Sequence, residues 1–92
     1  MKQTDIPEIN DKEIDLWNKL KKKHSNALLL VESDNYYFSL GNDAKEIAEL
    51  PESQISFNEK EEIVFIPALL MLNSIMQNLI NRGFRVVLCD QL

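Results

Sequence analysis

Cysteine, glycine and histidine are scarce in this 92-residue sequence, and their scarcity excludes several kinds of site. The single cysteine, Cys89, permits no internal disulfide and no cysteine-based metal site, so we expect no bound metal. The two glycines, Gly41 and Gly83, are too far apart to form a phosphate-binding loop, so we expect neither a nucleotide nor another cofactor. The one histidine, His24, follows a lysine run and suggests no nucleophile pair. The residues therefore indicate a protein that is not an enzyme.

The sequence also lacks a long apolar run. Its N-terminus is polar and acidic where a signal peptide would be apolar, and no later run approaches the length of a membrane span. We therefore expect no membrane contact and a cytoplasmic location. The hydrophobic fraction of 45% is typical of an ordered globular chain. A chain of this length suits one core, so we predict a polar N-terminal arm at 1–10 and a single domain at 11–92.

Positive charge is limited, since ten basic and fifteen acidic side chains give a formal net charge of −5. Such a field repels the phosphate backbone of nucleic acids. The one basic cluster consists of Lys19, Lys21, Lys22 and Lys23. A run of this kind is commonly a solvated helix end whose cations complement the helix dipole, and the alternative is a weak phosphate contact.

Caps, breakers and hydrophobic periodicity together define the order of elements. Asn10 with Glu13, and Asp43 with Glu46, look like capping pairs, while Pro51 and Gly83 end helices. The predicted helices span 11–23, 44–50 and 68–82, and the predicted strands span 27–31, 36–40, 55–57, 63–66 and 84–89. This α-β-β-α-β-β-α-β order predicts an α/β fold, with a mixed sheet of about five strands that contains antiparallel hairpins and is covered by three helices.

The longest predicted helix carries a continuous apolar stripe. At about 100° per residue, the stripe comprises Ala68, Leu69, Leu72, Ile75, Met76, Leu79 and Ile80. Leu70 lies outside it on a polar face, and we consider Leu70 a weak candidate for contact with a protein partner.

Three consecutive aromatic residues, Tyr36, Tyr37 and Phe38, follow a turn signal at 33–35. Neighbouring strand residues point to opposite faces, so Tyr37 lies on one face while Tyr36 and Phe38 share the other. At least one face must belong to the core. If the face of Tyr36 and Phe38 points inward, those rings are not available as a wedge for a ligand.

Two stretches of the chain are similar to a known family. The first stretch, at 16–50, reads LWNKLKKKHSNALLLVESDNYYFSLGNDAKEIAEL. It resembles the N-terminal mismatch-recognition domain (domain I) of MutS DNA mismatch repair proteins. In that domain a helix with a basic, His-containing end leads into an apolar strand, a Gly-Asp-Phe-Tyr-Glu segment and an alanine-rich helix. NLINRGFRVVLCDQL, at 78–92, resembles that domain's closing helix, glycine turn and final strand. The resemblance implies the MutS domain I fold as a stand-alone, degenerate copy.

The resemblance also implies which residues would meet DNA. In the family, the Phe of Gly-Asp-Phe-Tyr-Glu stacks on a mispaired base and the Glu hydrogen-bonds it. These positions fall on Tyr36 and Phe38, so the implied wedge region keeps a ring and loses the acid, and base-specific recognition should be impaired. The motif's Gly-Asp falls on Asp34 and Asn35. Phosphate contacts would come from the lysines at 19 and 21–23.

The implied function is therefore DNA mismatch recognition in repair, with weak binding of double-stranded DNA by the domain alone. The alternative is a protein-interaction module that keeps the fold without binding DNA. Tyr37 and Leu70 are the candidate partner contacts for that alternative.

Overall fold

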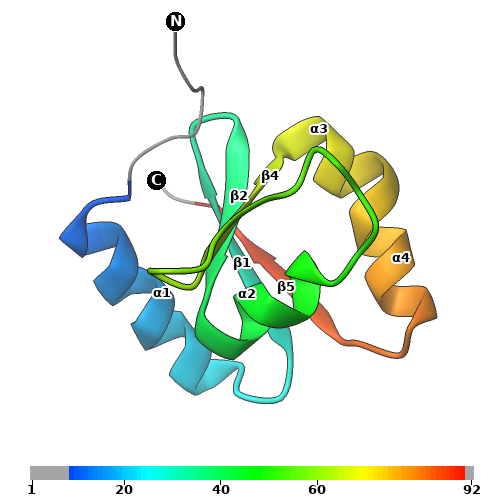
Figure 1. The fold of residues 1–92 in the computed structure, drawn as a ribbon. Coiled ribbons are helices and arrows are strands. Elements are labelled where there is room, and N and C mark those ends of the chain that lie inside the picture. The colour runs from blue at the N-terminus through cyan, green and yellow to red at the C-terminus, as the bar shows by residue number, and fades with distance from the viewer. Residues whose placement is uncertain (1–8, 91–92) are drawn as a thin grey trace, which may run out of the picture.

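The computed structural model describes residues 9–90, which form three layers with a sheet in the middle (Figure 1). The first eight residues of the predicted N-terminal arm lie outside the described part. Helix α1 covers one face of the sheet, and α2 and the α3–η1–α4 helix cover the other (Figure 1). The elements in chain order are α1 (Asp11–Lys23), β1 (Leu28–Ser33), β2 (Tyr36–Leu40), α2 (Gly41–Ala48), β3 (Ser56–Asn58), β4 (Ile63–Pro67), α3 (Ala68–Leu70), the π-helix η1 (Met71–Ile75), α4 (Met76–Asn81) and β5 (Val86–Cys89).

The sheet has five strands in the order β3-β4-β2-β1-β5. β1 pairs with β2, β2 with β4 and β3 with β4 in antiparallel fashion, whereas β1 and β5 are parallel. The prediction of a mixed five-strand sheet with two antiparallel hairpins is confirmed. Among the described residues, no helix is long and apolar enough to cross a membrane.

The start of α1 follows the predicted cap. The Glu13 backbone N–H donates to the Asn10 side chain at 2.9 Å, and the Asn10 backbone N–H donates to the Glu13 carboxylate at 3.2 Å. This reciprocal capping box satisfies two amide groups that the first helical turn leaves without partners.

The capping pair predicted for α2 is wrong, because Asp43 turns into the protein. α2 has no side-chain cap and begins at Gly41. The Asp43 carboxylate accepts hydrogen bonds from Lys21 Nζ at 2.9 and 3.1 Å and from the Leu29 backbone N–H at 3.0 Å. Buried polar groups need such partners. Because α2 begins at Gly41, Asp43 is the third residue of the helix and does not occupy the capping position.

Leu29 is a fully buried residue of β1 whose backbone depends on side chains. β1 pairs with β2 only from Val31 onward, so Leu29 has no strand partner on that side. Its N–H donates to Asp43, while its carbonyl accepts from Trp17 Nε1 at 3.0 Å and from Ser39 Oγ at 2.6 Å. One residue thus joins α1, β2 and the beginning of α2.

The apolar stripe predicted for the long helix is confirmed only in part. Ile75 and Leu79 are fully buried, and Ala68 and Met76 pack against the core. Leu69, Leu72 and Ile80 are instead exposed by 74%, 55% and 46%, and Met71, which the stripe omitted, is fully buried. The π-helical segment at Met71–Ile75 has more residues per turn than an α-helix, so a count at 100° per residue loses the phase across it.

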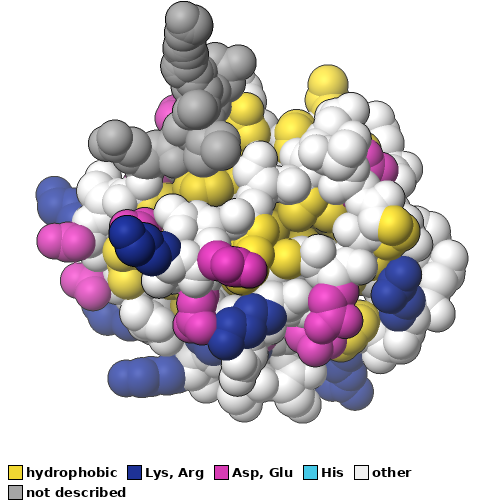
Figure 2. Space-filling model, in the orientation of Figure 1, with side chains coloured by type: hydrophobic (Ala, Val, Ile, Leu, Met, Phe, Trp, Pro, Cys, Tyr) yellow, Lys and Arg dark blue, Asp and Glu magenta, His cyan; other side chains and the backbone are white. Residues whose placement is uncertain are grey.

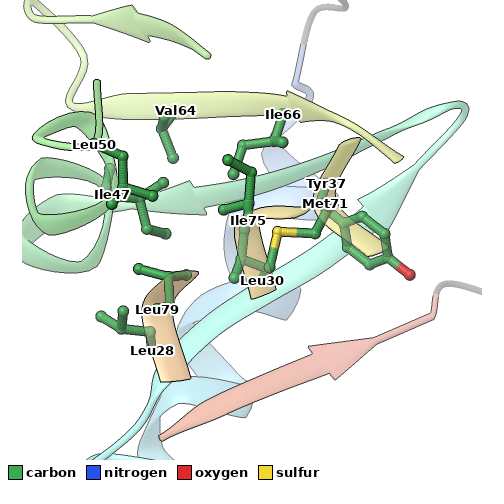
Figure 3. Packing of buried hydrophobic residues seen from close by; sticks show 11 residues of the cluster. Leu28, Leu30, Tyr37, Ile47, Leu50, Val64, Ile66, Met71, Ile75 and Leu79 are labelled. Carbon is green, nitrogen blue, oxygen red and sulfur yellow. The ribbon is translucent and has the colours of Figure 1, made fainter. Parts of the chain in front are cut away.

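The core on this side of the sheet is built around Met71, Ile75 and Leu79 (Figure 3). Leu28 and Leu30 of β1 belong to the same buried cluster (Figure 3). Leu70, predicted to be an exposed contact, is half-buried and packs against the same cluster, so it offers a partner less surface than Leu69 or Leu72 does.

Replacing Asp43 by alanine should lower the free energy of unfolding by about 2 to 4 kcal/mol, because the Leu29 N–H and the Lys21 ammonium both lose an acceptor. Urea unfolding followed by circular dichroism measures this. Lys45→Ala is the control, since it removes an exposed ion pair with Glu62 and should cost no more than about 1 kcal/mol. Equal losses for the two variants would contradict the role assigned to Asp43.

Candidate nucleic-acid interface

The turn between β1 and β2 has the backbone geometry of a glycine without containing one. Ser33 pairs with Tyr36, so the connection consists of Asp34 and Asn35. Asp34 adopts φ +56°, in the left-handed region that favours glycine. The resemblance described above places a glycine at this position. The turn therefore keeps the expected backbone conformation although the side chain differs.

The turn is also held against the end of β4, where α3 begins. The Asn35 carbonyl accepts a hydrogen bond from the Ala68 backbone N–H at 2.8 Å. Tyr36, the first residue of β2, pairs with Pro67, the last residue of β4. Asp34, Asn35 and Tyr36, which we call the hairpin tip, thus lie next to the first turn of α3.

Tyr36 is half-buried and packs edge-on against another ring. Its centroid lies 6.3 Å from that of Phe65, with an interplanar angle of 88°. This T-shaped contact is a favourable arrangement for two aromatic rings. Tyr36 keeps part of its surface exposed at the beginning of β2, so it is the member of the expected wedge region that a ligand can reach.

Phe38 shares the face of Tyr36, and that face points inward. The Phe38 side chain has no exposed surface and packs in a cluster with Trp17 and Phe65 beneath α1. Its ring cannot touch DNA unless the core unpacks, so the expectation of a DNA contact at Phe38 is corrected here. The hydrophobic residue at the position of the family's glutamate is explained by packing.

Tyr37 occupies the opposite face, as the strand alternation predicted. It belongs to the core on the side of α2 and α4 and is only 5% exposed. Its hydroxyl group points out of that cluster beside Met71 (Figure 3). Burial raises the pKa of the Tyr37 hydroxyl, and the negative charges of Glu32 and Asp90 raise it further. Tyr37 therefore offers a partner little more than its hydroxyl.

The surroundings of the hairpin tip are acidic. The Ser33 hydroxyl donates to the Glu13 carboxylate at 2.5 Å, which places the beginning of α1 beside the end of β1. Glu32 lies opposite Tyr37 in the sheet, and Asp34 is exposed in the turn itself. A surface of this charge is unfavourable for phosphate and attracts only a basic partner.

The predicted lysines lie at the other end of α1. Lys21 donates to the Ala27 carbonyl at 2.5 Å and pairs with Asp43, so it is a structural residue and unavailable to phosphate. Lys19, Lys22 and Lys23 are exposed. From Glu13 to Lys21 the helix rises by roughly 12 Å, so the basic cluster and the hairpin tip are well separated.

The space-filling view agrees with this separation. Basic side chains appear over α1, along the lower edge and at the right near α4, but none is visible at the end of the molecule that carries α3 (Figure 2). The structure therefore does not bring the predicted phosphate contacts and the wedge residue together. Within residues 9–90, no group of three or more His, Cys, Asp or Glu side chains is arranged to hold a metal ion.

Comparison with known proteins agrees with this architecture. The family model described as MutS domain I matches residues 13–92. The chain is 35% identical over 78 residues to the DNA mismatch repair protein MutS of Methanococcoides burtonii (strain DSM 6242 / NBRC 107633 / OCM 468 / ACE-M). That alignment covers 78% of this chain and 9% of the relative, so the chain spans less than a tenth of the relative's length.

Replacing Asp34 by glycine should stabilise the protein by about 0.5 to 1 kcal/mol, since glycine avoids the cost of a left-handed backbone but loses more chain entropy on folding. Asn35→Gly is the matched control. Asn35 has no positive φ, so glycine there should destabilise the fold. The midpoints of urea unfolding report both changes, and a loss of stability in Asp34→Gly would show that the turn gains nothing from glycine.

Proposed function

The chain belongs to the MutS domain I family, and from this premise we propose that it is a non-catalytic domain of DNA mismatch repair that docks weakly on duplex DNA with its hairpin tip. The observation that carries the proposal is Tyr36. It occupies the position of the family's stacking ring and keeps part of its surface exposed beside a turn with glycine-like geometry. A planar ring at this place can stack against a base step.

Base-specific recognition is impaired in this proposal. Phe38 occupies the position of the hydrogen-bonding glutamate, and its side chain is fully buried. Without that acceptor, the Tyr36 ring distinguishes base pairs only by how easily they unstack. The ring must also leave its contact with Phe65 before it can insert, and this cost lowers affinity further.

Affinity is also limited by charge and area. The acidic residues at the tip and the net charge of −5 oppose binding. A specific DNA-binding module usually buries about 600 to 1,000 Å² even when small, which is more than a hairpin tip provides.

We propose that a separate phosphate contact at the far end of α1 comes from Lys19, Lys22 and Lys23. We further propose a cytoplasmic location, as the single cysteine suggests.

Fluorescence anisotropy at low salt, with labelled duplexes that carry either a mismatch or a matched pair, tests this proposal. We expect weak binding of both duplexes with less than about a tenfold preference for the mismatch. Tyr36→Leu keeps an apolar side chain against Phe65 but removes the stacking ring, so affinity should fall by about fivefold.

Ile80→Ala is the control for that experiment, because Ile80 is exposed and lies near the end of the long helix that is far from the hairpin tip. It should leave the affinity unchanged. Negligible binding of both duplexes would reject DNA docking altogether. A strong preference for the mismatch would instead contradict the impaired base recognition.

A second candidate function is a protein-interaction module that does not bind DNA. It is favoured by the acidic hairpin tip and by the three exposed apolar side chains at Leu69, Leu72 and Ile80. Co-purification from the native cell under gentle conditions should then recover a protein complex. Recovery of the free chain alone would count against this candidate, whereas DNA recovered with the chain would favour the first.

A further inference from the structure

β5 is an open sheet edge in the described part of the chain, where its one hydrogen-bonded neighbour is β1. Natural edge strands are usually protected by charged residues, proline, a bulge or a covering element. The four residues Val86–Cys89 contain neither charge nor proline, and all four are half-buried. An unprotected apolar edge of this kind is a template for pairing with another strand.

The direction of the free hydrogen-bonding groups follows from one bond. The Leu28 N–H donates to the Arg85 carbonyl at 2.7 Å, so Arg85 directs its backbone groups toward β1. Backbone groups alternate in direction along a strand, so Val87 also faces β1 while Val86 and Leu88 direct their N–H and C=O groups outward. Two residues of β5 thus present unpaired donors and acceptors at the edge.

We propose that β5 pairs in antiparallel fashion with β5 of a second copy of this chain, about a two-fold axis that passes by Val87 perpendicular to the sheet. Val86 then lies opposite Leu88 of the partner subunit, so the outward groups of both residues meet as hydrogen-bonded pairs. Val87 lies opposite Val87 of the partner subunit. A two-fold axis requires each residue to face the same side of the sheet as its partner, and this register satisfies the requirement.

The charges next to β5 fit this pairing. Arg85 lies opposite Cys89 of the partner subunit and therefore beside Asp90 of the partner subunit, which carries the opposite charge. No two like charges are opposite each other. Each copy has a net charge of −5. Along the paired β5 edges, however, Asp90 of each copy lies beside an arginine of the other.

The same axis also brings the two long helices together. A two-fold axis perpendicular to the sheet keeps both α3–η1–α4 helices on the same face, one on each side of the junction. The helix contacts β5 through α4, and its residue Leu79 packs in the same cluster as Leu28 of β1 (Figure 3). With strands about 4.8 Å apart, helices over β1 and β5 of two copies are about 10 Å apart, which is a helix-packing distance.

The composition of the helix suits such an interface. From Ala68 to Asn81 it contains no charged residue, and interface cores are depleted of charge. Leu72, Met76 and Ile80 each directly follow one of the core residues Met71, Ile75 and Leu79, and therefore share one flank beside the buried side of the helix. In the proposed dimer these flanks face each other across the junction, which covers the apolar side chains that the π-helical segment leaves exposed.

Cysteine cross-linking tests the register. In a Cys89→Ser background, Val87→Cys should form an intermolecular disulfide rapidly under mild oxidation, because directly opposite residues of an antiparallel pair have Cα separations suitable for a disulfide. Leu88→Cys in the same background is the matched control and should cross-link at least about tenfold more slowly, since its opposite residue is Val86. Equal rates, or no cross-link in either variant, would overturn the proposed pairing.

Sedimentation velocity across the micromolar range tests the helix contact with the full chain. Leu72→Lys should weaken the dimer by at least about tenfold, because it places a charge on the buried flank. Leu69→Lys is the control, since Leu69 is exposed to an even greater extent but lies off that flank, and its effect should stay within about twofold. Circular dichroism verifies that both variants fold. A wild-type chain that remains monomeric throughout would reject the dimer, independently of any result with DNA.

Discussion

The backbone of Leu29 imposes the constraint on which the rest of the fold depends. This residue lies in the middle of the sheet with no exposed surface, at the point where β1 separates from β2. Unsatisfied backbone groups at such a position would be costly, and they are satisfied by side chains from three elements. Trp17, Ser39 and Asp43 therefore hold α1, β2 and α2 in fixed relation to the central strand.

This constraint decides which polar residues remain for function. Lys21 is drawn into the interior because Asp43 must bind it as well as Leu29, so one of the four predicted phosphate contacts is structural. The other lysines of the cluster remain exposed, but α1 carries them away from the hairpin tip. The candidate interface therefore consists of a half-buried tyrosine and a turn, and the predicted lysines do not lie beside them.

Much of the architecture was predictable from sequence, because local signals and tertiary packing agree in most elements. The Asn10 cap, the two hairpins and the order of elements are all confirmed. The errors occur where a local rule meets a tertiary demand. Asp43 has the sequence signature of a cap and is used by Leu29 instead, and the π-helical segment changes the phase of the long helix, which a fixed angle per residue cannot detect.

The candidate site was less predictable than the fold. The alternation of Tyr36, Tyr37 and Phe38 was correct, but alternation cannot reveal that helices cover both faces of β2. The left-handed conformation of Asp34 is also invisible in sequence, since aspartate gives a weaker signal for it than glycine does. The resemblance to the family locates the turn between β1 and β2. The structure then shows that Asp34 adopts the left-handed conformation that glycine favours.

The hydrogen bond between Asn35 and Ala68 has a mechanical consequence. It joins the hairpin tip to the first turn of the long helix, so the tip cannot separate from the helix without breaking this bond. The helix in turn lies against β5, at the far edge of the sheet from β3. The tip and the open edge are therefore the two ends of one series of contacts, which runs from the turn through the long helix to β5.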